Sequence, residues 1–339
     1  MKLSLIIPTY NRPHDIARLL RNLNLQIRKP DEVIIVDASE TSETRLFVEN
    51  NMDGFAYPVS YYSHEKGLTR QRNFGISKAQ YEIIGFTDDD SLFEPDYFLR
   101  IIAIFEKDTE NKIGGAAGFI VQVDHAKILE IDSRLGKISG KEDFSGLMQA
   151  YFAPHLIMQR SKARKWVDRI LFLHSDSEGT YCSSKGRFHY LKEPFSGQKA
   201  VDFLQGIAFY RKEVFDHVKY SEFFEGYGFG EDVHFSLQVG KRYKLMVDGE
   251  AMSYHLHTPS ARPDLFRIGY MHARNHFFIF KTYKERNMLN HLVFWYFFCV
   301  NAILEFIPAL AGKNSLHRIN LFLGRMYGGG ASILARERA

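Results

Sequence analysis

Hydrophobic and polar positions follow two alternating patterns over about the first 120 residues of the chain. Short apolar runs rich in β-branched residues predict strands, and the segments between them, with apolar residues three and four positions apart, predict helices. Strands are expected at 3–7, 33–37, 59–62, 83–87 and 116–123, and helices at 13–25, 42–50, 69–79 and 95–106. This order is typical of βαβ units, so we expect an α/β fold around a parallel sheet.

The middle of the chain has a different character. Residues 129–200 lose clear periodicity and are rich in Lys, Arg, His and Ser, which indicates an insertion. Regular pattern returns at 201–214. A loop of glycines and aromatic residues at 223–232 then leads into an expected helix at 233–239, and an expected strand follows at 245–257.

A long apolar segment runs from His291 to Ala311, and Glu305 is its only charged residue. Its length is close to that of a membrane span, and basic residues flank it on both sides, so the distribution of charge gives no orientation. We favour an in-plane or re-entrant amphipathic hairpin, followed by a basic and apolar helix at 316–327 that lies on anionic lipid. A single membrane span and a buried core helix are the alternatives.

The composition indicates a large hydrophobic core and no excess of either charge. Hydrophobic residues make up 45% of the 339 positions, and 44 basic residues nearly balance 40 acidic ones, which gives no indication of nucleic-acid binding. Cys182 and Cys299 favour neither a disulfide framework nor a cysteine-based zinc site, which fits a reducing cytosol. The apolar run at 3–7 is too short for a signal peptide and Pro8 interrupts it, so we expect catalysis to face the cytoplasm.

Three consecutive aspartates, Asp88, Asp89 and Asp90, follow the expected strand at 83–87. Carboxylates crowded at the end of a strand repel one another unless a cation or a donor-rich ligand lies between them, which favours a metal site. A solvated acidic turn is the alternative. Because parallel strands carry ligands at their carboxyl ends, residues 9–11 and 37–39 are expected to share one crevice with the triplet.

The dinucleotide fingerprint G-x-G-x-x-G and the P-loop motif are both missing after the first strand, so phosphate must be held in another way. A metal ion could do this, assisted by Arg70 and Arg72 near the start of an expected helix, where backbone amides favour anions. The alternative is that these two arginines are ordinary surface charges.

Two acids, Glu231 and Asp232, open the expected helix at 233–239. They are either capping residues that complement the helix dipole or a general base delivered by a glycine-rich loop. The neighbouring rings of Phe224, Tyr227 and Phe229 suit stacking on a sugar or filling a core.

His255 and His257 lie two positions apart at the end of the expected strand at 245–257. The period of a strand would direct both imidazoles to one face, where one of them could complete a metal shell made mainly of oxygen. A structural role for both histidines is the alternative.

Together these segments resemble family 2 glycosyltransferases of the GT-A fold. The matching runs, in order, are SLIIPTYNR at 4–12, IIVDAS at 34–39, RNFGI at 72–76, the aspartate-rich metal motif DDD at 88–90, GED at 230–232 and AMSYH at 251–255. Their order and spacing agree with the family over about residues 1–280. The family's usual Phe-Asp-Glu is replaced here by YSEFF at 220–224, and the basic stretch near Arg160 has no counterpart, which leaves the acceptor open.

The resemblance implies roles for individual residues near the donor. Asp37 would hydrogen-bond the base, and Asp88 would contact the ribose or the sugar. The other nucleotide-binding residues would be Pro8, Tyr10, Asn11, Arg70, Arg72 and Asp89.

It also implies the reaction. Asp89 or Asp90 would bind Mn²⁺ or Mg²⁺, with His255 as the family's metal-side histidine and His257 as its rival. Asp232, with Glu231 beside it, would act as the base of an inverting displacement.

We therefore expect a Rossmann-like GT-A domain with a C-terminal helical extension. Residues 1–125 would bind the nucleotide sugar, residues 126–285 would form the acceptor-binding and catalytic half, with the insertion near 129–200, and residues 286–339 would associate with a membrane. The expected activity is transfer of a sugar from a nucleotide-diphosphate sugar to a lipid-linked or cell-envelope glycan, at the cytoplasmic face of the membrane. Nucleotidyl or phosphoryl transfer, and binding without catalysis, are the alternatives.

Overall fold

The computed structural model describes residues 1–51, 54–123, 178–182, 187–258, 263–283, 287–310, 312 and 315–334. The chain divides into two compact units. The first comprises Met1–Gln159, Leu191–Gly226 and Phe235–Ala261, and the second comprises Arg160–Tyr190, Tyr227–His234 and Arg262–Ala339. The domain boundaries expected from the sequence stay a prediction.

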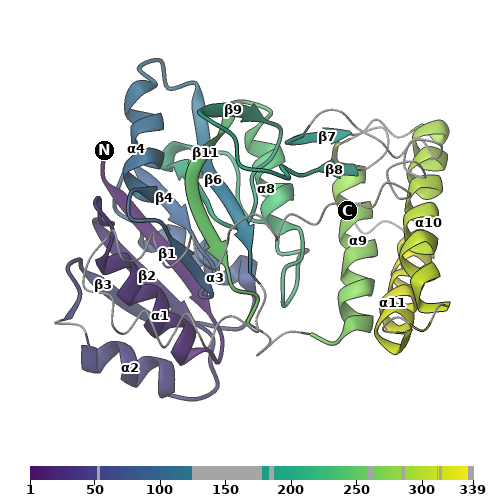
Figure 1. Ribbon diagram of the computed structural model, residues 1–339, viewed down its shortest axis with the longest axis horizontal. Coiled ribbons are helices and arrows are strands. Elements are labelled where there is room, and N and C mark those ends of the chain that lie inside the picture. The colour runs from purple at the N-terminus through teal and green to yellow at the C-terminus, as the bar shows by residue number, and fades with distance from the viewer. Residues whose placement is uncertain are drawn as a thin grey trace. The chain divides into compact units, whose positions relative to one another are not determined.

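Parallel strands form one half of the sheet in the first unit (Figure 1). They are β1 (Leu3–Thr9), β2 (Glu32–Asp37), β3 (Val59–Ser63) and β4 (Ile83–Phe86), in the order β3-β2-β1-β4. All three pairings are parallel, so the four carboxyl ends lie along one edge. The predicted parallel sheet is confirmed.

Helices cover both faces of this sheet because apolar side chains point alternately to either side of each strand. Leu3 and Leu5 of β1 pack with side chains of α1 (Pro13–Asn24) and α4 (Tyr97–Lys107), whereas Ile6 packs on the opposite face. That face also carries α3 (Leu68–Lys78), whose Gly75 approaches Ile6 closely. The short helix α2 (Glu43–Asn51) contributes Val48 to the first face.

The other half of the sheet is mixed. Strand β10 (Ala208–Arg211) pairs antiparallel with β4 and with β6 (Ile113–Gln122), and the short helix η4 (Lys212–Asp216) follows it. Strand β11 (Lys244–His255) runs parallel to β6 and antiparallel to β5 (Ser91–Phe93) and β9 (Gln198–Val201). The sequence pattern missed β5 because a three-residue strand has no periodicity of its own, and it placed the start of β6 three residues late.

The described residues of the second unit form a small hairpin and three long helices. The hairpin pairs β7 (Thr180–Cys182) with β8 (Arg187–His189), and the helices are α9 (Leu265–Tyr283), α10 (Met288–Leu310) and α11 (Ser315–Leu334). Helix α8 (Glu231–Val239) begins in this unit and ends in the first. Within the described residues, no helix combines the length and the apolar character that crossing a membrane requires.

Most of the insertion expected near 129–200, at 129–177 and 183–186, lies outside the described residues. The helix α9 was not predicted, because its apolar positions continue around the helix and Arg and His residues interrupt the stripe.

Candidate active site

The candidate site lies at the carboxyl ends of β1, β2, β4 and β11, all within the first unit. The pairing of β5 with β11 sets Ser91 opposite His255. Asp90 directly precedes Ser91, and its backbone oxygen accepts a hydrogen bond of 2.9 Å from the Leu256 amide. Strand register therefore brings the end of the aspartate triplet to the histidine.

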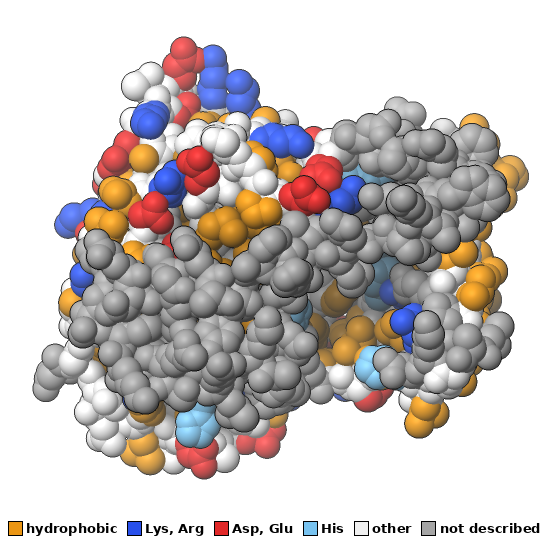
Figure 2. Space-filling model, viewed as in Figure 1, with side chains coloured by type: hydrophobic (Ala, Val, Ile, Leu, Met, Phe, Trp, Pro, Cys, Tyr) orange, Lys and Arg blue, Asp and Glu red, His pale blue; other side chains and the backbone are white. Residues whose placement is uncertain are grey.

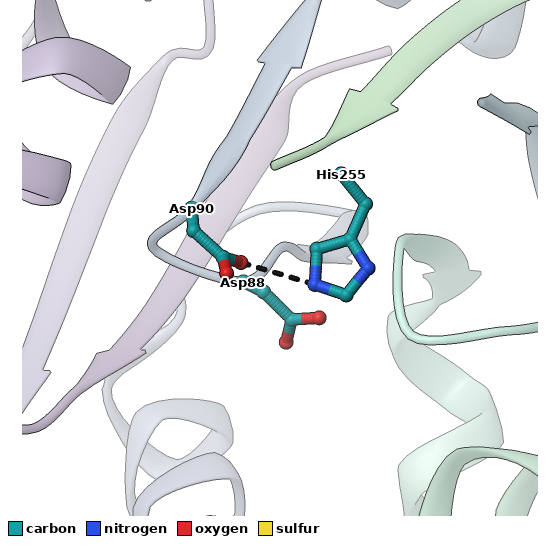
Figure 3. Close-up of side chains that lie close together, drawn as sticks. All are labelled: Asp88, Asp90 and His255. Carbon is teal, nitrogen blue, oxygen red and sulfur yellow. Dashed lines mark ion pairs between the residues drawn. The ribbon is translucent and has the colours of Figure 1, made fainter. Parts of the chain in front are cut away.

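Asp88, Asp90 and His255 form a compact cluster (Figure 3). One ligand atom from each lies within 4.8 Å of the others, and His255 Nε2 is 3.1 Å from Asp90 Oδ1. Asp90 Oδ2 accepts a hydrogen bond of 2.9 Å from the Thr258 amide. Burial alone would raise the pKa of Asp90, but the hydrogen bond and charge of His255, with Arg12 nearby, hold that pKa well below its ordinary value.

The middle aspartate, Asp89, lies outside this cluster. Its carboxylate accepts hydrogen bonds from Thr9 Oγ1 at 2.7 Å and from Arg12 Nη1 at 2.8 Å. Burial raises the pKa of Asp89 to about 7, an effect that Arg12 opposes and the charge of Asp90 reinforces. The geometry thus gives Asp88 the place in the metal cluster that the sequence reasoning offered to Asp89.

The two arginines of α3 have different surroundings. Arg72 is buried, its Nη2 lies 3.4 Å from Asp88 Oδ1, and its guanidinium lies over the Tyr220 ring at 5.2 Å. Arg70 is 42% exposed and pairs with Glu65 and Glu222. In this structure Arg72 belongs to the site, and Arg70 has the contacts of a surface charge.

The residues expected to hold the nucleotide meet where β1 and β2 end. Asp37 is buried and accepts hydrogen bonds from the Tyr61 hydroxyl at 2.7 Å and the Ser39 amide at 2.8 Å. Asn11 has a positive φ of 53°, and its backbone amide donates a hydrogen bond to Ser39 Oγ at 2.7 Å. Pro8 pairs with Val36 across the two strands. The loop after β1 is therefore fixed against the loop after β2.

Tyr10 directly follows β1 and is partly exposed. Its hydroxyl donates to Glu40 at 2.7 Å, and the Lys66 ammonium lies 3.6 Å from the centre of its ring. A cation held on an aromatic face beside the carboxyl ends of the strands adds positive charge where a diphosphate would bind.

Glu231 and Asp232 occupy the first turn of α8, in the second unit. Gly230, directly before them, has a positive φ of 86°, which glycine adopts without strain. The Glu231 side chain is buried, and Asp232 Oδ1 accepts a hydrogen bond of 2.7 Å from the Val233 amide. The catalytic role of both acids stays a prediction. That Asp232 faces the same cavity as the aspartate triplet is also a prediction.

Two aromatic rings of the loop before α8 pack against other parts of the protein. Phe224 is fully buried, so its ring fills the core and is not available to a sugar. Phe229 packs against His272 with ring centres 5.4 Å apart.

His257 is not in the cluster. It lies just beyond β11 with a positive φ of 52°, and its ring centre is 4.1 Å from that of His255. Both histidines contact Gln122 Oε1, which is 3.2 Å from His255 Nδ1. Among the described residues, His255 is the histidine that joins the aspartates.

The sequence did not predict that Arg12, Thr258 and Gln122 contact the residues of the candidate site. Arg12 is the last residue of the run SLIIPTYNR at 4–12, so its position was a signal that could have been used. Thr258 and Gln122 carry no local signal, because only the pairing of β11 with β6 and β5 brings them to the site.

The donor set suits a hard divalent cation. Two carboxylates and one imidazole match the preferences of Mn²⁺, and Mg²⁺ also favours carboxylate oxygen. The low pKa of Asp90 keeps that ligand ionised. Arg72 supplies a fixed positive charge on the same side.

Comparison with protein families gives a match over residues 4–219, more than half of the chain, to the model of glycosyl transferase family 2. An uncharacterized glycosyltransferase of Haemophilus influenzae is 33% identical over 107 residues, which is 31% of this chain and 35% of that protein. The Campylobacter jejuni GalNAc(5)-diNAcBac-PP-undecaprenol beta-1,3-glucosyltransferase is 29% identical over 92 residues, 26% of this chain and 29% of that protein. The matches thus span about a third of the relatives' length.

Two solved structures share the fold. The mannosyltransferase PcManGT from Pyrobaculum calidifontis, solved in complex with GDP-Man and Mn2+, has a TM-score of 0.55 and 13% identity, covering 99% of this chain and 88% of that chain. The 1-349 structure of S. aureus TarS has a TM-score of 0.51 and 14% identity, covering 100% of this chain and 93% of that chain. The predicted GT-A architecture is confirmed at the level of the fold.

Proposed function

This chain belongs to glycosyl transferase family 2, and from that premise we propose that it moves a sugar from a nucleotide-diphosphate donor to a hydroxyl with the help of a divalent metal ion. The membership expected from the motifs is confirmed, and with it a transferase enzyme. The observation that carries the proposal is the convergence of Asp88, Asp90 and His255 within 4.8 Å at the carboxyl ends of the strands.

The donor would bind along the ends of β1, β2 and β4. Asp37 would accept hydrogen bonds from the base, while Tyr10 and Asn11 line the pocket beside it. A bound Mn²⁺ or Mg²⁺ ion, held by Asp88, Asp90 and His255, would neutralise charge on the diphosphate. The solved relative bound to GDP-Man and Mn2+ supports this class of donor and this metal.

Arg72 would take part in the departure of the diphosphate. Its guanidinium is buried, so its charge is screened less than that of a surface arginine. It lies beside Asp88, where the diphosphate oxygens would be. A fixed positive charge there stabilises the negative charge that develops as the glycosidic bond breaks.

Asp232 would act as the general base. It would take the proton from the acceptor hydroxyl while the hydroxyl oxygen attacks the anomeric carbon from the side opposite the diphosphate, which inverts the configuration. Glu231, which is buried in the same helical turn, would assist Asp232.

The acceptor is proposed to be a lipid-linked or cell-envelope glycan. The Campylobacter jejuni relative, by its name, acts on an undecaprenol-linked glycan. A lipid-borne acceptor would place the enzyme at the cytoplasmic face of a membrane.

The outer surfaces of α10 and α11 suit contact with lipid. Large apolar side chains on these helices are exposed, among them Leu292, Ile303, Leu316 and Leu323, and hydrophobic side chains gather at the right of the space-filling view (Figure 2). The sequences of α9, α10 and α11 carry five lysines and arginines but a single acid, Glu305. Apolar surface with excess positive charge favours an anionic membrane surface.

The replacement Asp232→Asn tests the proposed reaction, because it removes the base while keeping the shape of the side chain. We expect transfer to fall by about 10²- to 10⁴-fold while nucleotide affinity, measured by calorimetry, is unchanged. Glu225→Gln, at an exposed acid in the loop before α8, serves as the matched control and should keep full activity. Full turnover by the Asp232→Asn enzyme would remove Asp232 from the role of base.

A further inference from the structure

We propose that Arg12 and Asp89 form a positioning ion pair that holds Asp88 and Asp90 in the geometry needed to bind the metal ion. This inference rests on the proposed function, since it concerns the same metal site. Arg12 Nη1 lies 2.8 Å from Asp89 Oδ1, and the two side chains are only 11% and 6% exposed. The pair is therefore a buried element of the site and not a surface contact.

The bonds of Asp89 hold it in place on both sides. One carboxylate oxygen accepts from Arg12, and the other accepts from Thr9 Oγ1 at the end of β1. Its neighbours Asp88 and Asp90 instead face His255. Anchoring the middle of the triplet to β1 thus separates one structural carboxylate from two that can act as ligands.

Arg12 also reaches the third loop of the site. Its Nη2 donates to the backbone oxygen of Thr258 at 3.2 Å, and the Thr258 amide donates to Asp90 Oδ2. The Thr258 hydroxyl donates to the buried Asp15 at 2.9 Å. One guanidinium consequently joins the ends of β1, β4 and β11, and a planar group with several fixed donors is suited to this task.

Loss of either partner should disturb the metal ligands. Without Arg12, the buried Asp89 carboxyl would lose its hydrogen-bond donor, and the turn that carries Asp88 and Asp90 would have to rearrange. Without Asp89, Arg12 would be drawn to Asp90, since Nη1 is already 3.6 Å from Asp90 Oδ2. In that case a cation of the protein would compete with the metal for its ligand.

The test is a titration of the full chain with Mn²⁺ alone, using Arg12→Gln, Asp89→Asn and the double variant. Outer partners of metal ligands typically change metal affinity by 10- to 100-fold, so we expect each single variant to weaken Mn²⁺ binding by at least about tenfold. The double variant removes the same pair at once, and we expect its loss of affinity to be clearly smaller than the sum of the two single losses, because both single variants break one shared interaction. Arg12→Lys, which keeps the charge but cannot reach both Asp89 and Thr258, should fall between.

Folding and positioning can be separated in this experiment. Arg100→Gln removes an ion pair of the first unit outside the site, 2.6 Å from Asp96, and should leave Mn²⁺ affinity unchanged whatever it does to thermal stability. Wild-type affinity in both single variants, or tighter binding by Arg12→Gln, would overturn the positioning role. A wild-type chain that does not bind Mn²⁺ would overturn the metal site itself, and the two failures are therefore distinguishable.

Discussion

Neighbouring side chains of the aspartate triplet have different surroundings, and this difference decides what each can do. Asp90 receives a hydrogen bond from the Thr258 amide and faces His255, which lowers its pKa. Asp89 is buried against Arg12 and Thr9. Asp88 is partly exposed beside Arg72. Chemistry at a site of this kind depends on which carboxylate is ionised and which is already bound by the protein.

Two histidines of the second unit, His272 and His276, should make the stability of the protein depend on pH. Burial, with the charge of Arg325, lowers the pKa of His272 well below its usual value and that of His276 to about 3. The unfolded chain therefore binds protons below about pH 6.5 that the folded chain does not, and stability falls as the pH drops from 6.5 towards 3. Between pH 7.5 and 5.5 we expect a loss of about 1.4 kcal/mol for each histidine, measured by urea unfolding.

The variants His272→Phe and His276→Phe should reduce this dependence on pH. His217→Gln, at an exposed histidine of the first unit, is the control and should retain it. An equal free energy of unfolding at pH 5.5 and pH 7.5 in the wild-type chain would contradict the prediction.

The sequence predicted individual site residues only where they adjoin an expected strand. Asp88 to Asp90 follow an apolar run, and Asp37 ends another, so the rule for parallel strands was sufficient to place them together. Arg12 and Thr258 are 246 residues apart, and their contact depends on the register of β11. No local pattern contains that information.

At the scale of elements, α9 and α11 pack through glycines. A Cβ on Gly324 would lie 2.0 Å from the backbone oxygen of Phe266, and one on Gly269 would lie 2.3 Å from that of Leu321. Replacing Gly324 by Ala would therefore force the helices apart. We expect Gly324→Ala to lower the free energy of unfolding by about 1–3 kcal/mol, measured by chemical denaturation followed by circular dichroism.

Gly330 of the same helix provides the matched control. A Cβ there would meet nothing within 4 Å, and alanine is the better helix former by up to about 1 kcal/mol. Gly330→Ala should accordingly be neutral or stabilising. Equal stability of the two variants would show that close packing of α9 on α11 does not matter.

The strength of the periodic signal decided which elements the sequence could predict. Helix α1 combines Pro13 at its start with buried apolar residues at helical spacing, and its predicted and observed bounds differ by one residue. Strand β5 has only three residues and is fixed by pairing with β11. Elements that depend on distant partners are the ones that local reasoning missed.

At the scale of the whole molecule, the proposed membrane contact is testable with vesicles. The exposed Leu292 and Leu316 belong to the apolar surfaces of α10 and α11. We expect the protein to sediment with vesicles that contain anionic lipid and less with neutral ones, because both apolar insertion and positive charge contribute. The double variant Leu292→Glu, Leu316→Glu should lower the bound fraction at least severalfold, since buried apolar area is lost and like charge is added.

Leu99→Glu is the control, since Leu99 is also exposed but lies in α4 of the first unit. It should bind vesicles as the wild type does. Binding that is equally strong for neutral vesicles, or unchanged in the double variant, would argue against this surface.

We propose that the chain is a metal-dependent transferase that releases a nucleoside diphosphate. The most direct measurement is a panel of nucleotide-diphosphate sugars incubated with the enzyme, Mn²⁺ and a lipid-linked glycan acceptor, with the released nucleotide and pyrophosphate quantified together. We expect nucleoside diphosphate to form in step with glycosylated acceptor, and both to be lost on chelation or in Asp90→Asn. Release of pyrophosphate would contradict the account. So would full activity of the wild-type enzyme after chelation, or full activity of Asp90→Asn.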